Sequence, residues 1–290
     1  MKKTKIDNSN VVVLKNIDKT IIRKYKVKGL NGYPRTVPQN KILKILEGSN
    51  VRHPKLIKNG FRYVDIENIE GRTLYDTTDI NVVISTVCNF IFEMHKINCE
   101  PIKKYAKWLN NSSFLYFQVN NLLAFVRKTK NIEKFKKMGI DFAPILALKN
   151  IRLDDQRGLS LIHGNIRKNN IIEHNGEYTL IDWELATYGD IAYELAMHFV
   201  DEEYSQENMN VVIDRLALSL NLNQINLSKD INYYINFEYY RKSILGFNEA
   251  IKLKHKKENY DDVLAKTYHY YSKLPNYLSI DKLREVIEEK

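Results

Sequence analysis

The sequence predicts an α+β protein with two lobes: a small N-terminal lobe built on an antiparallel sheet and a larger, mainly helical C-terminal lobe. Short runs of β-branched residues dominate residues 1–70, whereas apolar residues recur at helical spacing from about Ile80 onward. We place the boundary at Glu70, so that residues 1–70 form the N-lobe and residues 71–290 the C-lobe. A chain of 290 residues is long enough for this arrangement.

The elements of the N-lobe follow from local patterns. The β-branched runs at residues 11–14 and 20–25 flank a mostly polar spacer, which predicts a hairpin. Residues 39–46 carry apolar side chains on one helical face and precede Gly48, a typical helix stop. Residues 61–67 alternate between apolar and polar, which predicts a strand that runs into the connection to the C-lobe.

The C-lobe begins with a helical stripe from Ile80 to Met94 that predicts a helix ending near His95. Asn175-Gly176 lies between two short apolar runs within residues 171–182, the strongest hairpin signal in the chain. Four further helices are predicted at residues 208–220, 231–251, 260–274 and 279–289.

Composition excludes several classes of protein. Hydrophobic residues make up 44% of the chain and charged residues 28%, the balance of a globular protein rather than a disordered or fibrous one. Polar residues interrupt every apolar stretch short of the roughly 18 residues that a membrane span needs, so we expect no span and a cytoplasmic protein. Only two cysteines occur, Cys88 and Cys99, which exclude a disulfide scaffold and a structural zinc site.

The chain is basic, with 45 Lys and Arg against 35 Asp and Glu and a formal net charge of +10. Such a charge favours an anionic partner: nucleotide phosphates, nucleic acid or an anionic surface. The lysines are interspersed with acidic residues, as on solvated helix faces. No motif for RNA or DNA binding accompanies them, so nucleic-acid binding is disfavoured.

The segment 161–172, LIHGNIRKNNII, contains the most informative pattern. His163, Asn165 and Asn170 are followed, after the predicted hairpin, by Asp182 in the run Ile181-Asp182-Trp183-Glu184. This spacing resembles the catalytic loop and metal-binding Asp of the protein-kinase-like fold. Together with the segment 188–196, YGDIAYELA, it is similar to the branch of aminoglycoside phosphotransferases and choline kinases.

The resemblance implies a bilobal protein-kinase-like fold that binds ATP or GTP and Mg²⁺. It implies transfer of the γ-phosphoryl group to a hydroxyl of an aminoglycoside-like or amino-alcohol acceptor, which can be cationic, and with an aminoglycoside a role in antibiotic resistance. Asn170 and Asp182 are then the Mg²⁺ ligands, which suits a cation that takes few protein oxygens besides phosphates and water. His163 is expected to brace the loop.

The resemblance also assigns residues to the nucleotide. Ser9 and Asn10 match the loop over the phosphates, without its usual glycines, and Arg23 or Lys24 is the cation that holds the α- and β-phosphates. Alternation places these two side chains on opposite faces of the strand, and both stay open as candidates. Glu67 and Ile69 lie where the hinge offers backbone groups to the purine. Gln39 stands where the family has a Glu that orients the cation, so an ion pair would become a weaker hydrogen bond.

Asn165 stands where the family has its catalytic Asp. An amide cannot accept the hydroxyl proton, and general-base contributions are typically ~10²–10⁴-fold. Three explanations are compatible with Asn165: an introduced isosteric substitution, a naturally slow kinase, or a kinase-like nucleotide- or ligand-binding module without catalysis.

The remaining polar candidates have simpler interpretations. Asp190 and Glu194 are expected to anchor the loop, and the acidic run 201–203 either attracts a cationic substrate or starts a solvated helix. Three histidines without partners at ligand spacing are expected on the surface or satisfied in the core: His198, His255 and His269. An aromatic stripe is predicted as core, or alternatively as a pocket wall that favours a cationic amine: Tyr233, Tyr234, Phe237 and Tyr240, with Ile244.

Overall fold

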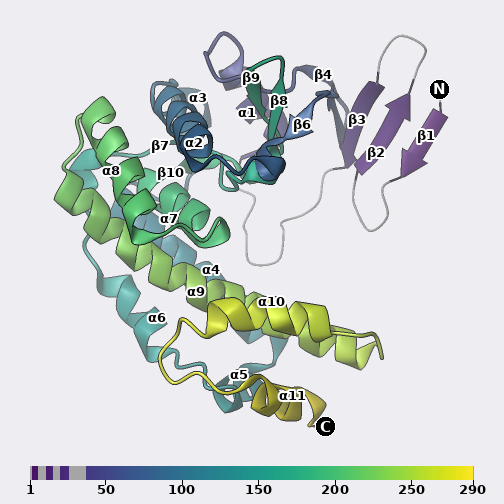
Figure 1. Ribbon diagram of the computed structural model, residues 1–290, viewed down its shortest axis with the longest axis vertical. Coiled ribbons are helices and arrows are strands. Elements are labelled where there is room, and N and C mark those ends of the chain that lie inside the picture. Colours follow the sequence, from purple (N-terminus) through teal and green to yellow (C-terminus); the bar gives the residue numbers. More distant parts are fainter. Residues whose placement is uncertain (1, 6–10, 16–19, 26–36, 290) are drawn as a thin grey trace.

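The computed structural model describes residues 2–5, 11–15, 20–25 and 37–289. It confirms a bilobal α+β fold, with an antiparallel sheet at one end of the molecule and a larger helical region at the other (Figure 1).

The N-lobe contains a five-stranded antiparallel sheet in the order β1-β2-β3-β5-β4. Its strands are β1 (Lys2–Lys5), β2 (Val11–Lys15), β3 (Thr20–Tyr25), β4 (Leu56–Asn59) and β5 (Tyr63–Glu67). The predicted hairpin corresponds to β2 and β3, and the predicted strand at residues 61–67 to β5. The two edge strands, β1 and β4, were not predicted from the sequence. Three of the four residues of β4 are exposed, so it lacks the alternation that reveals a half-buried strand.

Helix α1 (Gln39–Leu46) is the helix predicted in this lobe. Ile42, Leu43 and Leu46 are buried on one face, and the helix packs against β4 and against the 3₁₀ turn η5 (Trp183–Leu185) of the C-lobe. Gly48 follows with a φ of 82°, a left-handed conformation that favours glycine and ends the helix.

The helices of the C-lobe are α2 (Ile80–His95), α3 (Glu100–Lys103), α4 (Asn111–Thr129), α5 (Ile132–Lys137), α6 (Ala143–Ala147), α7 (Ile191–Asp201), α8 (Gln206–Leu220), α9 (Gln224–His255), α10 (Asp261–Tyr271) and α11 (Ile280–Glu288). Its strands are β6 (Arg72–Thr73), β7 (Ser160–Ile162), β8 (Ile171–His174), β9 (Glu177–Leu180) and β10 (Thr187–Gly189), which form a β7–β10 pair and a sheet in the order β6-β8-β9. The other 3₁₀ turns are η1 (Leu74–Asp76), η2 (Leu148–Asn150), η3 (Asp155–Arg157) and η4 (Lys168–Asn170).

The helix predicted to begin at Ile80 and the four C-terminal helices are confirmed as α2, α8, α9, α10 and α11. Helix α7 is the centre of the lobe, because residues 191–200 are all buried. It packs against α9, which also contacts α10 (Figure 1). The aromatic stripe of α9 lies mainly in this core, since Tyr234, Phe237, Tyr240 and Ile244 are buried.

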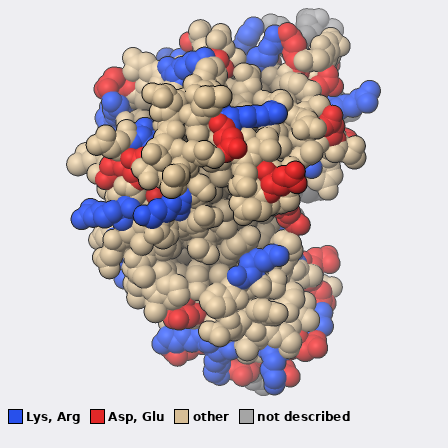
Figure 2. Space-filling view, turned by 60° about the vertical axis from the view of Figure 1, so that its left-hand side comes forward, with Lys and Arg blue, Asp and Glu red and all other residues tan. Residues whose placement is uncertain are grey.

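Charged side chains are mixed over the surface, and Figure 2 shows Lys and Arg interspersed with Asp and Glu on one face of the molecule. This distribution matches the solvated helix faces expected from the sequence. In the part of the chain that the structure describes, no helix is both long enough and apolar enough to span a membrane.

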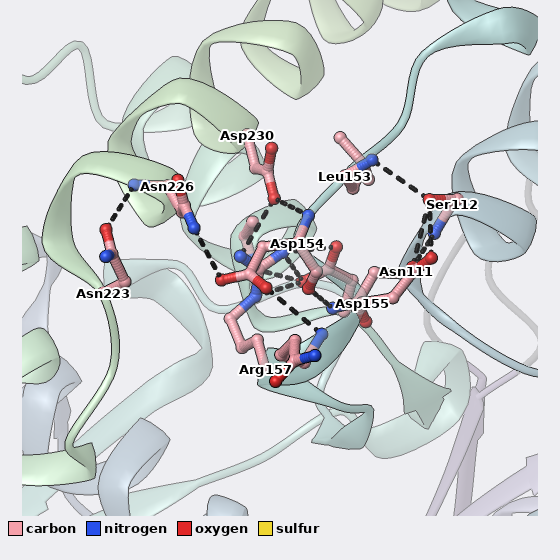
Figure 3. Close-up of polar contacts among 12 residues, drawn as sticks. Asn111, Ser112, Leu153, Asp154, Asp155, Arg157, Asn223, Asn226 and Asp230 are labelled. Carbon is pink, nitrogen blue, oxygen red and sulfur yellow. Dashed lines mark hydrogen bonds and ion pairs between the residues drawn. The ribbon is translucent and has the colours of Figure 1, made fainter.

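A buried ionic network joins η3 to the two central helices. The Arg157 guanidinium donates to both carboxylate oxygens of Asp190 at 3.0 Å and to Asp230 of α9 at 3.0 Å. Tyr234 donates its hydroxyl to Asp190 at 3.1 Å. Asp230 also accepts the backbone N–H of Asp154 at 2.9 Å (Figure 3). The guanidinium therefore neutralises two carboxylates that would otherwise be buried without a counterion.

Removing this guanidinium should destabilise the fold strongly. We expect Arg157→Met to lower the free energy of unfolding by about 3–5 kcal/mol, because it leaves Asp190 and Asp230 buried without a cation. Urea unfolding measures the difference. The control is Lys136→Met, which removes an exposed ion pair with Glu133 and should cost no more than about 1 kcal/mol. Equal losses for the two variants would contradict a structural role of the network.

Candidate active site

The β8–β9 hairpin brings Asn170 and Asp182 to the same place. Ile171 pairs with Leu180 in the hairpin. One residue further toward the open end, the Ile181 N–H donates to the Asn170 carbonyl at 2.8 Å. Asn170 therefore precedes one strand and Asp182 follows the other. The hairpin predicted from Asn175-Gly176 is confirmed, with φ values of 52° and 79° at these two residues.

The Asn170 side chain has a defined orientation. Its amide nitrogen donates to the Asn165 carbonyl at 2.9 Å, which leaves the amide oxygen as the group open to a ligand. Asp182 has a left-handed backbone, with φ 69° and ψ 48°, a conformation that Asp tolerates better than most residues. One amide oxygen and one carboxylate are thus presented at the open end of the hairpin.

Lys24 of β3 reaches this end of the hairpin. Its ammonium contacts the carboxylate of Asp182 and lies 3.3 Å from Glu184 Oε1. Burial would raise the pKa of Asp182, but the Lys24 ammonium outweighs it and holds that pKa below its usual range. The contact places a cation of the N-lobe directly against the predicted metal-binding carboxylate.

Arg23 is directed elsewhere. It forms a bidentate ion pair with Asp65 on the neighbouring strand β5, with distances of 2.7 and 2.8 Å, and its guanidinium stacks over the Tyr63 ring at 3.8 Å. Of the two candidate cations that the sequence left open, Lys24 lies with Asp182, whereas Arg23 fastens β3 to β5.

Glu184 is a site residue to which the sequence analysis assigned no role. Its carboxylate lies beside the Lys24 ammonium, where a Glu from α1 was expected to orient the cation. Gln39, which stands at that α1 position, is buried, and its amide nitrogen has no hydrogen-bond partner among the described residues. The only sequence signal for Glu184 was its place two residues after Asp182.

Helix α7 holds the backbone of the loop between β7 and β8. The buried Glu194 carboxylate accepts the backbone N–H groups of His163, Gly164 at 2.9 Å and Ile166 at 3.4 Å. One turn further along α7, the His198 Nδ1–H donates to the Ile166 carbonyl at 3.0 Å, and the Tyr204 hydroxyl lies 3.1 Å from His198 Nε2. These contacts agree with the anchoring role expected for Glu194 and satisfy His198 within the core.

His163 is completely buried beneath the loop. Its Nε2–H donates to the Ile181 carbonyl at 2.9 Å, and its ring packs edge-on against Trp183. Burial lowers the pKa of His163 to about 4, so the ring is neutral at physiological pH. Its position is that of a brace between the loop and the hairpin.

The acidic run 201–203 ends α7 rather than starting a helix, which corrects one interpretation of the sequence. Asp201 lies 2.9 Å from Arg167 and contacts the Lys242 ammonium. Glu202 accepts the backbone N–H of Lys168 at 2.9 Å. Basic residues of the loop and of α9 therefore pair with the acidic run at the end of the helix.

Asn165 is half-buried on the loop, and its carbonyl accepts the Asn170 amide. At the expected hinge, the Glu67 N–H donates to the Lys55 carbonyl at 3.0 Å, while the backbone of Ile69 makes no hydrogen bond with any described residue. Ser9 and Asn10 lie outside the described residues.

The donor set suits a hard divalent cation bound jointly with phosphates. Among the described residues, no cluster of three or more His, Cys, Asp or Glu side chains could hold a metal by itself. Asn170 and Asp182 provide two oxygen donors, the small protein contribution that Mg²⁺ takes when phosphates and water complete its shell. The residues present therefore fit this metal.

A cavity of about 460 Å³ lies beside the loop. Arg167 and Asn169 of the loop, the acidic run 201–203, Tyr75 of η1, and Lys266, His269 and Tyr270 of α10 line it. Two of these lining residues are in contact, since His269 Nε2 lies 3.2 Å from Glu203 Oε1. The cavity has room for a small organic molecule next to the loop that carries Asn165.

Comparison with known proteins identifies relatives of this arrangement. The model of the phosphotransferase enzyme family matches residues 5–220. Among solved structures, an ethanolamine kinase from Plasmodium vivax has a TM-score of 0.67 at 16% identity, covering 95% of this chain and 82% of that one. A choline kinase from Streptococcus pneumoniae has a TM-score of 0.60 at 17% identity, covering 95% of this chain and 90% of that one.

A ternary complex of streptomycin, ATP and APH(2")-IIa has a TM-score of 0.56 at 14% identity, covering 82% of this chain and 84% of that one. At these identities the likeness shows the fold. No curated protein matches the sequence.

The anchoring of His198 predicts a pH-dependent stability. Burial lowers the pKa of His198, so the unfolded chain binds a proton that the folded protein excludes, and this part of the stability is lost as the pH falls below about 6.5, the ordinary histidine value. We expect His198→Gln to cost about 1–3 kcal/mol at pH 7, because two buried hydrogen bonds are disturbed, and to cost less at pH 5. Urea unfolding at both pH values measures the difference, and a cost that grows on acidification would contradict a neutral His198.

Proposed function

Because the chain belongs to the phosphotransferase enzyme family, we propose that it transfers the γ-phosphoryl group of ATP or GTP to a hydroxyl of a small molecule. The observation that carries the proposal is the grouping of Lys24, Asp182 and Asn170, a cation and two oxygen donors brought together from the sheet and the hairpin. Phosphoryl transfer depends on positioning and charge neutralisation, which such a grouping supplies.

The nucleotide would bind between Lys24 and the end of the hairpin. Lys24 is the cation for the α- and β-phosphates, and Glu184 orients it. The carbonyl of Glu67 and the N–H of Ile69 are the groups offered to the purine. Asn170 and Asp182 would hold Mg²⁺, which when bound neutralises charge on the β- and γ-phosphates.

The acceptor would occupy the cavity beside the loop. Proteins of similar structure include kinases of ethanolamine and choline and an enzyme bound to streptomycin and ATP, so an amino-alcohol or an aminoglycoside is the proposed acceptor class. Phosphorylation of an aminoglycoside would make the protein a resistance enzyme. Tyr75 and Tyr270 offer aromatic rings to a cationic acceptor, although Lys168 and Lys242 already lie 5.8 and 5.0 Å from these rings.

Asn165 favours a second candidate, a nucleotide- or ligand-binding module without turnover. Its amide can orient an acceptor hydroxyl but cannot take the proton. Both candidates use the same proposed nucleotide-binding residues, Lys24, Asn170 and Asp182, so they share nucleotide binding and differ in transfer.

Restoring the carboxylate distinguishes the two candidates. Asn165→Asp should raise Mg²⁺-dependent transfer from ATP or GTP to choline, ethanolamine or streptomycin by up to about 10²–10⁴-fold, the range of a general base. Product formation from radiolabelled nucleotide measures it. Absence of transfer in both the parent and Asn165→Asp would instead support the binding module.

The metal assignment has its own test. Asp182→Ala should abolish the Mg²⁺-dependent part of the affinity for non-hydrolysable ATP and GTP analogues, because it removes the only carboxylate of the proposed ligand pair. Calorimetric titration with and without Mg²⁺ measures this. Asn165→Ala is the control and should leave nucleotide affinity unchanged, since Asn165 faces the acceptor. Unchanged Mg²⁺-dependent affinity in Asp182→Ala would refute the assignment.

A further inference from the structure

We propose that His269, oriented by Glu203, is the base that receives the acceptor proton in this protein. The inference rests on the proposed function and asks which group accepts the proton when Asn165 cannot.

Three titratable groups in or against the loop are already engaged. His163 is buried and donates to the Ile181 carbonyl, and both ring nitrogens of His198 are occupied by Ile166 and Tyr204. The Glu194 carboxylate is buried and accepts backbone N–H groups of the loop. None of these three groups lines the cavity.

The two acidic residues at the end of α7 are also in use. Asp201 lies between Arg167 and Lys242, and Glu202 accepts the backbone N–H of Lys168. A carboxylate held by cations is a weak base, because the paired cation favours its ionised form.

His269 differs from these groups. Its side chain is 41% exposed and lines the cavity, so a bound molecule can reach it. Nε2 lies 3.2 Å from Glu203 Oε1, which fixes the proton on Nε2 and leaves Nδ1 as an acceptor. Nδ1 makes no hydrogen bond with any described residue. An imidazole oriented by a carboxylate is the usual arrangement of a general base.

The loop that carries Asn165 borders the same cavity. Arg167 and Asn169, two and four residues after Asn165, line it, and Asn165 itself is half-buried rather than enclosed. An acceptor bound in the cavity therefore lies between this loop and His269 of α10.

Glu203 also has an unusual backbone. Its φ is 53°, a left-handed conformation that costs of order 1 kcal/mol or more for a residue other than glycine. This backbone places a carboxylate directly after α7 and opposite His269.

The acceptor hydroxyl gives its proton to His269 Nδ1 while its oxygen forms a bond to the γ-phosphorus of the nucleoside triphosphate. The bond between that phosphorus and the β–γ bridging oxygen breaks, and the nucleoside diphosphate leaves with the electron pair. Imidazolium, held by Glu203, then releases the proton to solvent. Asn165 orients the hydroxyl by hydrogen bonding.

The test combines variants of both residues. His269→Gln should lower the parent's transfer from ATP about 10²-fold, with water, choline, ethanolamine and streptomycin as acceptor probes. In the Asn165→Asp background the same substitution should leave transfer unchanged, because the aspartate supplies the base. Glu203→Gln should lower transfer in the parent but have no further effect when combined with His269→Gln, as expected of a positioning residue. His255→Gln, an exposed histidine outside the cavity, is the matched control.

The outcomes separate this proposal from the proposed function. Equal transfer by the parent and His269→Gln, or a loss that persists in full in the Asn165→Asp background, would overturn the role of His269. Transfer by Asn165→Asp with none by the parent, even to water in single-turnover assays, would overturn it too while leaving the phosphotransferase function intact. Absence of Mg²⁺-dependent nucleotide binding in calorimetry would overturn the proposed function itself.

Discussion

One face of α7 positions the loop on which the whole candidate site depends. Asp190, Glu194 and His198 follow one another at intervals of four residues, so they share a face of the helix. Asp190 binds Arg157 before β7, Glu194 accepts loop N–H groups, and His198 donates to the Ile166 carbonyl. Because these groups are buried, an unpaired member would carry a large desolvation cost, and the loop backbone has little freedom to move away.

The second constraint is the ion pair between the lobes. Lys24 comes from a strand of the N-lobe sheet, whereas Asp182 and Glu184 follow the hairpin of the C-lobe. The Lys24 ammonium is the proposed phosphate-binding cation. This ion pair therefore holds it beside Asp182, the proposed metal ligand. Glu184, close to Asp182 in the chain, provides a carboxylate beside Lys24 that Gln39 cannot, so the proposed orienting residue lies in η5 rather than in α1.

Local sequence patterns were enough to predict the hairpin and the residues at its open end. The hairpin follows from Asn175-Gly176, because a tight turn needs two left-handed residues and this pair tolerates them. Once the hairpin is set, Asn170 and Asp182 flank its open end. Helix α1 and the bilobal division were also predictable, since burial of an apolar face imposes a period on the sequence. The edge strands β1 and β4 were not, because β4 is largely exposed and β1 consists mainly of lysines.

Which side chains come into contact depends on how the elements pack, and local patterns do not specify that packing. Alternation along β3 separates Arg23 from Lys24 but does not say which face of the sheet turns toward the C-lobe, and that choice is set by packing of the two lobes. The acidic run at the end of α7 gave no sign of its pairing with Arg167 and Lys242, which come from other elements. His269 and Glu203 are likewise far apart in the sequence. Contacts of this kind depend on how buried helices such as α7, α9 and α10 pack, and local sequence patterns specify each helix but not its neighbours.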